Sequence, residues 1–343
     1  MWGTAIGEDV VLAGVNRHKQ GALKAFADKD LAEISSAGFQ RQSPSFSDCL
    51  AFRRILLGLG TVAEEPRNEW KTLAFVWGLV SIMPLWQLLV LAVVQGVAEF
   101  LPISSSGHIV VLGGLMEVPE LAELNIVLHL GSLGSILVFY RERILQLLSV
   151  DRRVNVMLIL ATIPAVVIGL TLKKYAEFIL ESPLVAGVMF PITGLAVLSL
   201  SRKPDPNAVE YSSINWKQAL AIGFSQAAAI LPGLSRSGST ISSGVGVGLT
   251  RSSAAAFSFL MAIPVIAGAG VLESKDWFTG EKQWGTPPWQ LALGAFVAFV
   301  VGIGTLQLLS RWLAKGQMAF FGWYCIVLGF VVVAWQLSLL GSS

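Results

Sequence analysis

Residues 96–111 read GVAEFLPISSSGHIVV and place a glutamate, three serines and a histidine inside a long apolar region. Between residues 72 and 116, Glu99 and His108 are the only ionisable side chains. Proline and glycine break helices, and neighbouring serines compete for backbone hydrogen bonds. The stretch therefore predicts a loop between two apolar helices. An ionisable side chain in such a place is a functional candidate.

The composition of the chain indicates an integral membrane protein. Hydrophobic residues make up 54% of the 343 residues and charged residues only 13%, whereas soluble proteins carry about 25% charged residues. The net charge of +2 gives no reason to expect a nucleic-acid partner. Cys49 and Cys325 lie far apart with no CxxC pattern, so we expect neither a disulfide nor a zinc site and interpret each as a small apolar filler.

Six further segments are each close to the roughly 20 apolar residues that a helix needs to cross a bilayer. Backbone groups in lipid must be hydrogen-bonded within the protein, so we expect helices there. The segments are 124–140, 154–172, 183–200, 253–272, 289–310 and 318–340, and charged breaks separate them.

Two regions, 85–116 and 216–249, do not fit a simple span. Each is an apolar segment, a break rich in Pro, Gly and Ser, and a second apolar segment; the second break reads LPGLSRSGST from residue 231 to 240. Irregular backbone at membrane depth is tolerated only when it is buried in protein or lines a wet cavity. We therefore interpret both regions as re-entrant hairpins.

The two hairpins predict an inverted repeat. Both show Gln, a short apolar gap, Leu-Pro and then serines before Gly, over residues 95–107 and 226–238, with a shift of one residue. Three spans follow each hairpin, and an odd number of crossings inverts the second unit relative to the first. The predicted fold is an all-α polytopic membrane protein with six transmembrane helices plus two re-entrant hairpins. Repeat one covers about 83–203, and repeat two covers about 213–340.

The loop charges predict the orientation, because Lys and Arg favour cytoplasmic loops. The face opposite the mouth of the first hairpin receives ten such residues: Arg141, Arg143, Arg152, Arg153, Arg202, Lys203, Lys217, Arg251, Arg311 and Lys315. The other face receives four: Lys173, Lys174, Lys275 and Lys282. The first hairpin is therefore expected to open outward and the second inward.

Residues 1–82 stand apart as an N-terminal extension of unknown role, and the membrane domain is expected over 83–343. The extension has scattered charges, no secretory signal pattern and, through residue 70, no sustained apolar run. The favoured interpretation is that the natural protein begins near Met83. A short regulatory or disordered tail is the alternative.

Two groups of polar side chains in the first hairpin suggest chemistry. Gln95 and Glu99 lie four residues apart on one helical face, and their oxygens suit a hard cation such as Mg²⁺ or Ca²⁺. Ser104, Ser105 and Ser106 open a helix, where hydroxyls and free N–H groups suit a phosphate. His108 can then act as base, acid or nucleophile. A plain polar loop and a hydrogen-bonded core histidine are the simpler alternatives.

The other two histidines are given no role. His129 lies inside an apolar run, and we interpret it as a core histidine. His18 lies in the N-terminal extension.

Arg236 is the most informative residue of the second hairpin. A guanidinium at a hairpin tip needs an anionic partner and can hold a phosphate in a bidentate manner. The alternative is a structural ion pair with Glu99 that requires no ligand. If the two hairpins meet, carboxylate, histidine, arginine and hydroxyls converge in one dry pocket suited to phosphoryl transfer. The polar set expected around Arg236 is Gly233, Ser235, Ser237 and Thr240.

The stretches QGVAEFLPISSSGH and LPGLSRSGST resemble the (E/Q)xxxE-plus-SSxGH and PGxSRSxxT signatures of the undecaprenyl-diphosphate phosphatase, or bacitracin-resistance, family. The resemblance covers about Met83 to Leu340 and implies the fold described above. It implies removal of the terminal phosphate of undecaprenyl diphosphate at the outer face of the bacterial plasma (inner) membrane. This activity regenerates the lipid carrier for peptidoglycan and thereby serves cell-wall biogenesis, cell shape and bacitracin resistance.

The resemblance also implies roles for single residues. Gln95 and Glu99 match the ends of the acidic motif, and Glu99 is expected to be catalytic as well as metal-binding. Ser105 matches the nucleophilic or phosphate-contacting serine, His108 the catalytic histidine and Arg236 the arginine that neutralises the diphosphate. Gln95 stands where the motif also admits Glu, so we expect the metal to be held mainly by the diphosphate. The diphosphate-binding set is Ser104, Ser106, Gly233, Ser235, Ser237 and Thr240.

A transporter is the rival interpretation. Inverted repeats and broken helices suit an ion-coupled transporter or a lipid-phosphate flippase equally well. The serines, His108 and Arg236 favour a phosphate site over a translocation path. The sequence leaves open the oligomeric state, with a homodimer among the options, and whether serine or water is the nucleophile.

Overall fold

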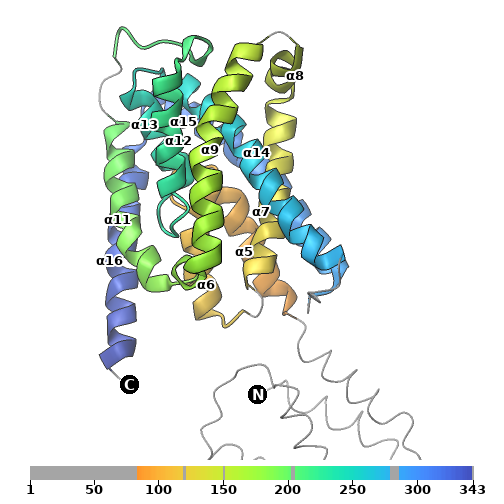
Figure 1. Cartoon of the computed structure of the whole chain (residues 1–343). Coiled ribbons are helices and arrows are strands. Elements are labelled where there is room, and N and C mark those ends of the chain that lie inside the picture. The colour runs from red at the N-terminus through yellow and green to blue at the C-terminus, as the bar shows by residue number, and fades with distance from the viewer. Residues whose placement is uncertain (1–82, 119–120, 150, 202–204, 279–285, 342–343) are drawn as a thin grey trace, which may run out of the picture. The chain divides into compact units, whose positions relative to one another are not determined.

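The computed structural model describes residues 83–118, 121–149, 151–201, 205–278 and 286–341. The expectations for residues 1–82 lie outside the described residues. Within the described part, regular structure is helical apart from one isolated parallel bridge between Val209 and Leu249. The chain therefore has the all-α fold that its composition predicts (Figure 1).

Helices lie at both predicted hairpins and at the six predicted apolar segments. The first predicted repeat contains α5 (Leu85–Ala98), α6 (Ser105–Leu115), α7 (Leu121–Phe139), α8 (Arg141–Ser149), α9 (Arg152–Tyr175), α10 (Glu177–Leu180) and α11 (Pro183–Ser199). A 3₁₀ turn at Tyr211–Ser213 follows. Repeat two contains α12 (Trp216–Ala228), α13 (Arg236–Gly246), α14 (Arg251–Phe278), α15 (Pro288–Lys315) and α16 (Ala319–Gly341).

Four helices are long and apolar enough to cross a membrane: Arg152–Leu172, Arg251–Leu272, Pro288–Lys315 and Ala319–Leu339. A fifth candidate combines Leu124–Phe139 with Arg141–Ser149, which meet at a bend of 74°. The predicted span at 183–200 is α11, whose 17 residues measure about 25 Å against a hydrocarbon core of about 30 Å. The protein is thus a multi-pass membrane protein, and six full spans stay a prediction.

Both predicted hairpins are helix–break–helix units. In the first, residues 99–104 separate α5 from α6, and in the second, residues 229–235 separate α12 from α13. Ser104 caps α6 by accepting a hydrogen bond from Gly107 N, and Ser235 caps α13 by accepting one from Gly238 N. Because these two caps are equivalent, they align SSSG of the first break with SRSG of the second.

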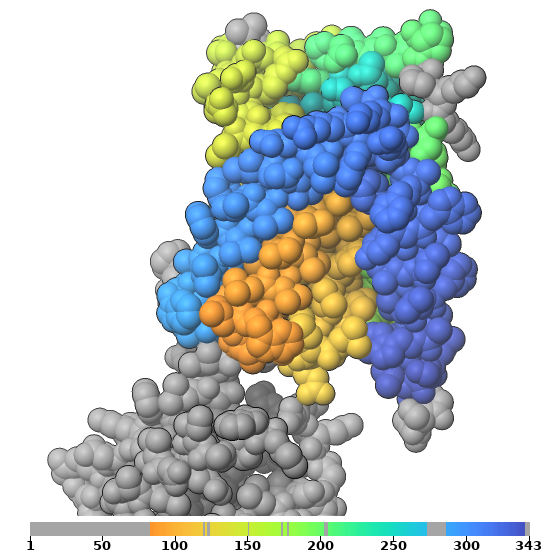
Figure 2. All heavy atoms as spheres, turned by 180° about the vertical axis from the view of Figure 1, so that it is seen from behind, coloured from red at the N-terminus to blue at the C-terminus, as the bar shows by residue number. Residues whose placement is uncertain are grey.

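Helices of the two predicted repeats pack against each other. The helix α5 of the first hairpin packs against α15, and α12 of the second hairpin packs against α9. Small residues permit these contacts: a Cβ on Gly96 would lie 2.8 Å from Ala298 O, and one on Gly223 would lie 2.4 Å from Ala161 O. Figure 2 shows the orange α5 at the surface beside the blue helices of repeat two. Helices of the two predicted repeats are therefore in close contact.

The α11 and α16 helices form a third contact between the predicted repeats. They pack closely along their length, and a Cβ on Gly194 would lie only 2.5 Å from Gly322 O. Large apolar side chains such as Phe320 and Phe330 are exposed on α16. An extensive exposed apolar surface is expected where a protein faces lipid.

Candidate active site where the two helix breaks meet

Each break contacts the first turn of the helix that follows the other break. A Cβ on Gly107 would lie 2.7 Å from Gly233 Cα, and Ser237 Oγ donates to Leu101 O at 3.1 Å. Gly233 has a φ of +87°, a backbone conformation that would be strained in a residue with a side chain. Thr193 of α11 fixes the second break, because its hydroxyl donates to Gly233 O at 2.7 Å and accepts from Ser235 N at 2.8 Å.

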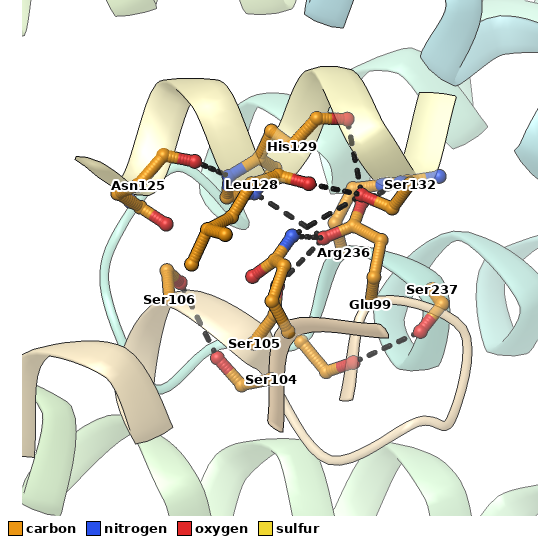
Figure 3. A network of polar contacts seen from close by, with 12 residues as sticks. Glu99, Ser104, Ser105, Ser106, Asn125, Leu128, His129, Ser132, Arg236 and Ser237 are labelled. Atoms are coloured by element: carbon orange, nitrogen blue, oxygen red, sulfur yellow. Dashed lines mark hydrogen bonds and ion pairs between the residues drawn. The ribbon is translucent and has the colours of Figure 1, made fainter. Parts of the chain in front are cut away.

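The Glu99 carboxylate is the centre of the site. It lies at the end of α5, its side chain is only 4% exposed, and donors from four helices surround it (Figure 3). One oxygen pairs with Arg236 Nη2. The other lies 2.7 Å from Ser105 Oγ, 3.0 Å from Gln95 Nε2 and 3.2 Å from His129 Nε2. This set of donors makes the burial of a charged group tolerable.

The contact with His129 requires a proton beyond that of a neutral imidazole. His129 Nδ1 lies 2.7 Å from the carbonyl oxygen of Asn125, which can only accept, so Nδ1 carries a hydrogen. Nε2 faces the carboxylate of Glu99. A second proton must therefore lie between Nε2 and the carboxylate, because two lone pairs would otherwise face each other.

His108 lies on α6 at the edge of the site. Its Nδ1 is 2.7 Å from Ser104 O, and its Nε2 is 2.8 Å from the hydroxyl of Tyr324 on α16. Ser104 has a φ of +70°, an uncommon conformation for a residue other than glycine. That backbone aims its carbonyl at the imidazole. Residues in such conformations cluster at functional sites.

Arg236 is the first residue of α13, and its side chain is 17% exposed. The ion pair with Glu99 that the sequence offered as an alternative is present, and a weaker hydrogen bond joins Nη1 to Ser258 O at 3.5 Å. The guanidinium also lies 5.9 Å from the centre of the Phe259 ring. A phosphate would therefore have to share Arg236 with Glu99 or displace the carboxylate.

The remaining predicted binding residues lie around these groups and mostly bond one another. Ser104 and Ser106 are 3.4 Å apart, and Ser235 and Ser237 are 3.2 Å apart, between hydroxyl oxygens. The hydroxyl of Thr240 donates to Arg236 O at 2.7 Å. Thr240 thus braces the first turn of α13 and pairs with the hydroxyl of Ser258.

Comparison with known proteins identifies the family of the chain. Residues 88–331 match the family described as Bacitracin resistance protein BacA. The chain belongs to the BacA family. It is 48% identical over 248 residues to the undecaprenyl-diphosphatase of Rhodopirellula baltica, covering 72% of this chain and 96% of that relative.

More distant relatives carry the same name. The undecaprenyl-diphosphatase of Desulfosudis oleivorans is 36% identical over 71% of this chain and 96% of its own length. That of Methanococcus maripaludis is 34% identical over 71% of this chain and 98% of its own length. The resemblance inferred from the two signatures is confirmed.

The interpretation of His129 as an ordinary core histidine is wrong, since the residue contacts Glu99. The sequence did contain a signal: Asn125, His129 and Ser132 follow helical spacing, so they share one face of α7, and Ser132 Oγ lies 3.3 Å from Gln95 Nε2. Tyr324 and Thr193 were also missed. Hydroxyl residues in apolar spans are common, and nothing in the sequence links these two to the hairpins.

The residues present fit a divalent cation only in part. Within the described residues there is no cluster of three or more His, Cys, Asp or Glu side chains that could hold a metal. Gln95 Oε1 is buried and has no hydrogen-bond partner among the residues that the structure describes. The Glu99 oxygens already receive four donors. The protein thus offers too few free oxygens for a six-coordinate cation, and a ligand would have to supply the others.

The contact between the breaks can be tested with two alanine substitutions in α6. Gly107→Ala would place a methyl group 2.7 Å from Gly233, so we expect it to lower the free energy of unfolding by about 1–3 kcal/mol. Gly114→Ala meets its nearest atom at 3.7 Å and should be tolerated. Thermal unfolding in detergent measures both. Equal stability of the two variants would contradict the contact between the breaks.

Proposed function

We propose that the chain is an undecaprenyl-diphosphatase, which hydrolyses undecaprenyl diphosphate to undecaprenyl phosphate and inorganic phosphate. The contact that carries the proposal is the 2.7 Å hydrogen bond from Ser105 Oγ to Glu99, beside the guanidinium of Arg236. A hydroxyl on a buried carboxylate, next to a fixed cation, is an arrangement suited to phosphoryl transfer. The names of the relatives supply the substrate, and the activity recycles the carrier for cell-wall polymers.

The proposed reaction begins at Ser105. Glu99 accepts the proton of the Ser105 hydroxyl, and Oγ attacks the terminal phosphorus. The bond from that phosphorus to the bridging oxygen breaks, and undecaprenyl phosphate leaves with the bonding electrons. Water then cleaves the phosphoserine, which releases inorganic phosphate and restores Ser105. Direct attack by water, with Ser105 as a phosphate contact, is the alternative.

This scheme changes the role expected for His108. The base that contacts Ser105 is Glu99, whereas His108 Nε2 faces Tyr324. We assign His108 to the opposite side of the diphosphate, where it exchanges a proton with the leaving phosphate. The pair matches the acid–base division that phosphoryl transfer uses.

Arg236 is the proposed diphosphate clamp. It pairs with Glu99 through one carboxylate oxygen, while Ser105, Gln95 and His129 reach the other. If the guanidinium turns to the phosphates, Glu99 keeps three donors. When Arg236 exchanges Glu99 for a phosphate, the guanidinium still has an anionic partner and the carboxylate still has its other donors. The serine hydroxyls of both breaks and the N–H groups of α6 and α13 complete the cradle.

A divalent cation, Mg²⁺ or Ca²⁺, is proposed to arrive with the diphosphate. Gln95 Oε1 and Glu99 are its protein ligands, supported by the unpartnered amide oxygen beside the carboxylate. When bound, such an ion would neutralise negative charge on the phosphates. Most of its oxygen ligands would come from the substrate and water.

We also propose the complete topology of six spans and two re-entrant hairpins in the bacterial plasma membrane, with the site open to the outside. The interlocked packing of α5 on α15 and of α12 on α9 supports the inverted repeat. The balance of Lys and Arg between the loops supports the orientation. A homodimer stays a prediction. The transporter interpretation is weaker, because the relatives described above carry the name of an enzyme.

Replacing Arg236 tests the clamp. Arg236→Ala should lower phosphate release from undecaprenyl diphosphate by at least about 100-fold, the loss typical of removing a transition-state donor. Arg236→Lys keeps the charge without the fork and should retain partial activity. Arg311→Ala, which removes an exposed arginine at the end of α15, is the matched control. Full turnover by a folded Arg236→Ala protein would end the clamp assignment.

Replacing His129 tests its hydrogen bond to Glu99. His129→Leu removes a hydrogen bond to a buried charge, which contributes about 1.5–3 kcal/mol. We expect lower thermal stability and slower phosphate release. His129→Gln keeps a donor and should restore most of both. If Leu and Gln behave alike, the hydrogen bond to Glu99 is not what His129 contributes.

Metal removal tests the cation. Phosphate release by the purified protein should fall in EDTA and recover with Mg²⁺ or Ca²⁺. Because the diphosphate supplies most ligands, the protein alone should bind the ion weakly, which calorimetry without substrate can measure. Unchanged turnover after exhaustive chelation would rule the cation out.

A further inference from the structure

Tyr324 joins α16, the last helix, to the site in the first hairpin. Its hydroxyl lies 2.8 Å from His108 Nε2, across 216 residues of sequence. The neighbouring residues on the same helix, Trp323 and Phe320, are 60% and 74% exposed, and Tyr324 itself is 38% exposed. Tyr324 therefore reaches from the lipid-facing surface to the imidazole of the site.

The direction of the hydrogen bonds follows from the acceptors. His108 Nδ1 faces the carbonyl oxygen of Ser104, which can only accept, so Nδ1 carries the hydrogen. In a neutral imidazole Nε2 then presents a lone pair, and the phenol of Tyr324 is the donor to it. The two partners together select one tautomer and one ring orientation.

Aromatic contacts hold the same ring from two sides. The rings of Tyr324 and His108 are nearly parallel, with 6° between their planes and 5.8 Å between their centres. Phe190 of α11 meets His108 nearly edge-on, at 79° and 5.2 Å. Because α11 and α16 pack against each other through Gly194 and Gly322, the two aromatic contacts come from one rigid helix pair.

Tyr324 is partly exposed, whereas Glu99 is buried. The Glu99 side chain is 4% exposed and contacts Ser105, so the nucleophile and its base lie inside the protein. Tyr324 is partly exposed on α16 and contacts His108. In the proposed reaction the leaving group stays attached to its lipid tail, which must remain in the membrane.

We propose that Tyr324 is a positioning residue for His108, holding Nε2 as the proton-exchanging atom on the leaving-group side of the diphosphate. This inference rests on the proposed phosphatase function. The phenol fixes the tautomer and the ring while the site is empty of substrate, and it yields Nε2 to the leaving phosphate during turnover. With the phenol withdrawn, the Nε2 lone pair takes up a proton from the bound diphosphate and returns it to undecaprenyl phosphate as that group leaves. His108 is therefore neutral again when Tyr324 returns to the same nitrogen.

The kinetic test removes only the hydroxyl. Tyr324→Phe keeps the stacked ring, and we expect kcat to fall about tenfold with KM changed less than about twofold, because misplacement of a catalytic group is costly. Trp323→Phe, on the adjacent lipid-facing position, is the matched control and should retain wild-type kinetics. In a His108→Gln background, Tyr324→Phe should have no further effect, since residues that act as a unit are not additive.

A purely structural role predicts a different pattern. Tyr324→Phe would then lower thermal stability and reduce kcat equally with and without His108. Equal, additive losses, or an unchanged kcat in the single variant, would overturn the inference.

A spectroscopic test separates this inference from the phosphatase proposal. The chain has only three histidines, so ¹⁵N-histidine NMR in nanodiscs can assign each ring with single His→Gln variants. Tyr324→Phe should shift the Nε2 resonance of His108 and leave that of His129 in place. If wild-type protein releases no phosphate, the phosphatase proposal fails. An unshifted His108 Nε2 resonance would reject the Tyr324 inference on its own.

Discussion

The structure depends on one buried carboxylate. Glu99 sits in the apolar interior, and an unpaired charge there would cost several kcal/mol. Its partners come from four helices: Gln95 from α5, Ser105 from α6, His129 from α7 and Arg236 from α13. Each helix must therefore keep its place along the others, because a shift of one turn would leave the charge without a donor. The functional site and the register of the hairpins are set by the same contacts.

The two hairpins contribute unlike residues to the site. Ser105 and Arg236 are both the first residue of a helix that a serine caps, so they occupy equivalent positions in the two hairpins. Both positions contact the same carboxylate, that of Glu99. One hairpin supplies a hydroxyl and the other a cation. An exact copy of either hairpin would have supplied two nucleophiles or two cations, but not the pair that phosphoryl transfer requires.

Much of the fold could be predicted from residue types, because a bilayer leaves few alternatives to helices and makes isolated polar residues conspicuous. Glu99, Ser105 and Arg236 stood out for that reason, and the structure brings them together. The sequence could not predict that Glu99, and not His108, would be the base in contact with Ser105. Glu99 and His108 both lie within a few residues of Ser105, so spacing alone does not distinguish them. Tyr324 was out of reach as well: its place depends on the packing of α11 against α16, which involves glycines that occur throughout the chain.

The cluster around Glu99 also carries an unbalanced charge. Arg236 contributes one positive charge, and the proton between His129 and Glu99 makes that pair neutral as a whole. The sum is one positive charge in a largely apolar interior, where fields are weakly screened. An anion completes such a site more readily than a cation does. The same sum supports the proposal that a metal ion enters only with the diphosphate that offsets it. His129, which is absent from the two signatures, contributes to this charge through its contact with Glu99.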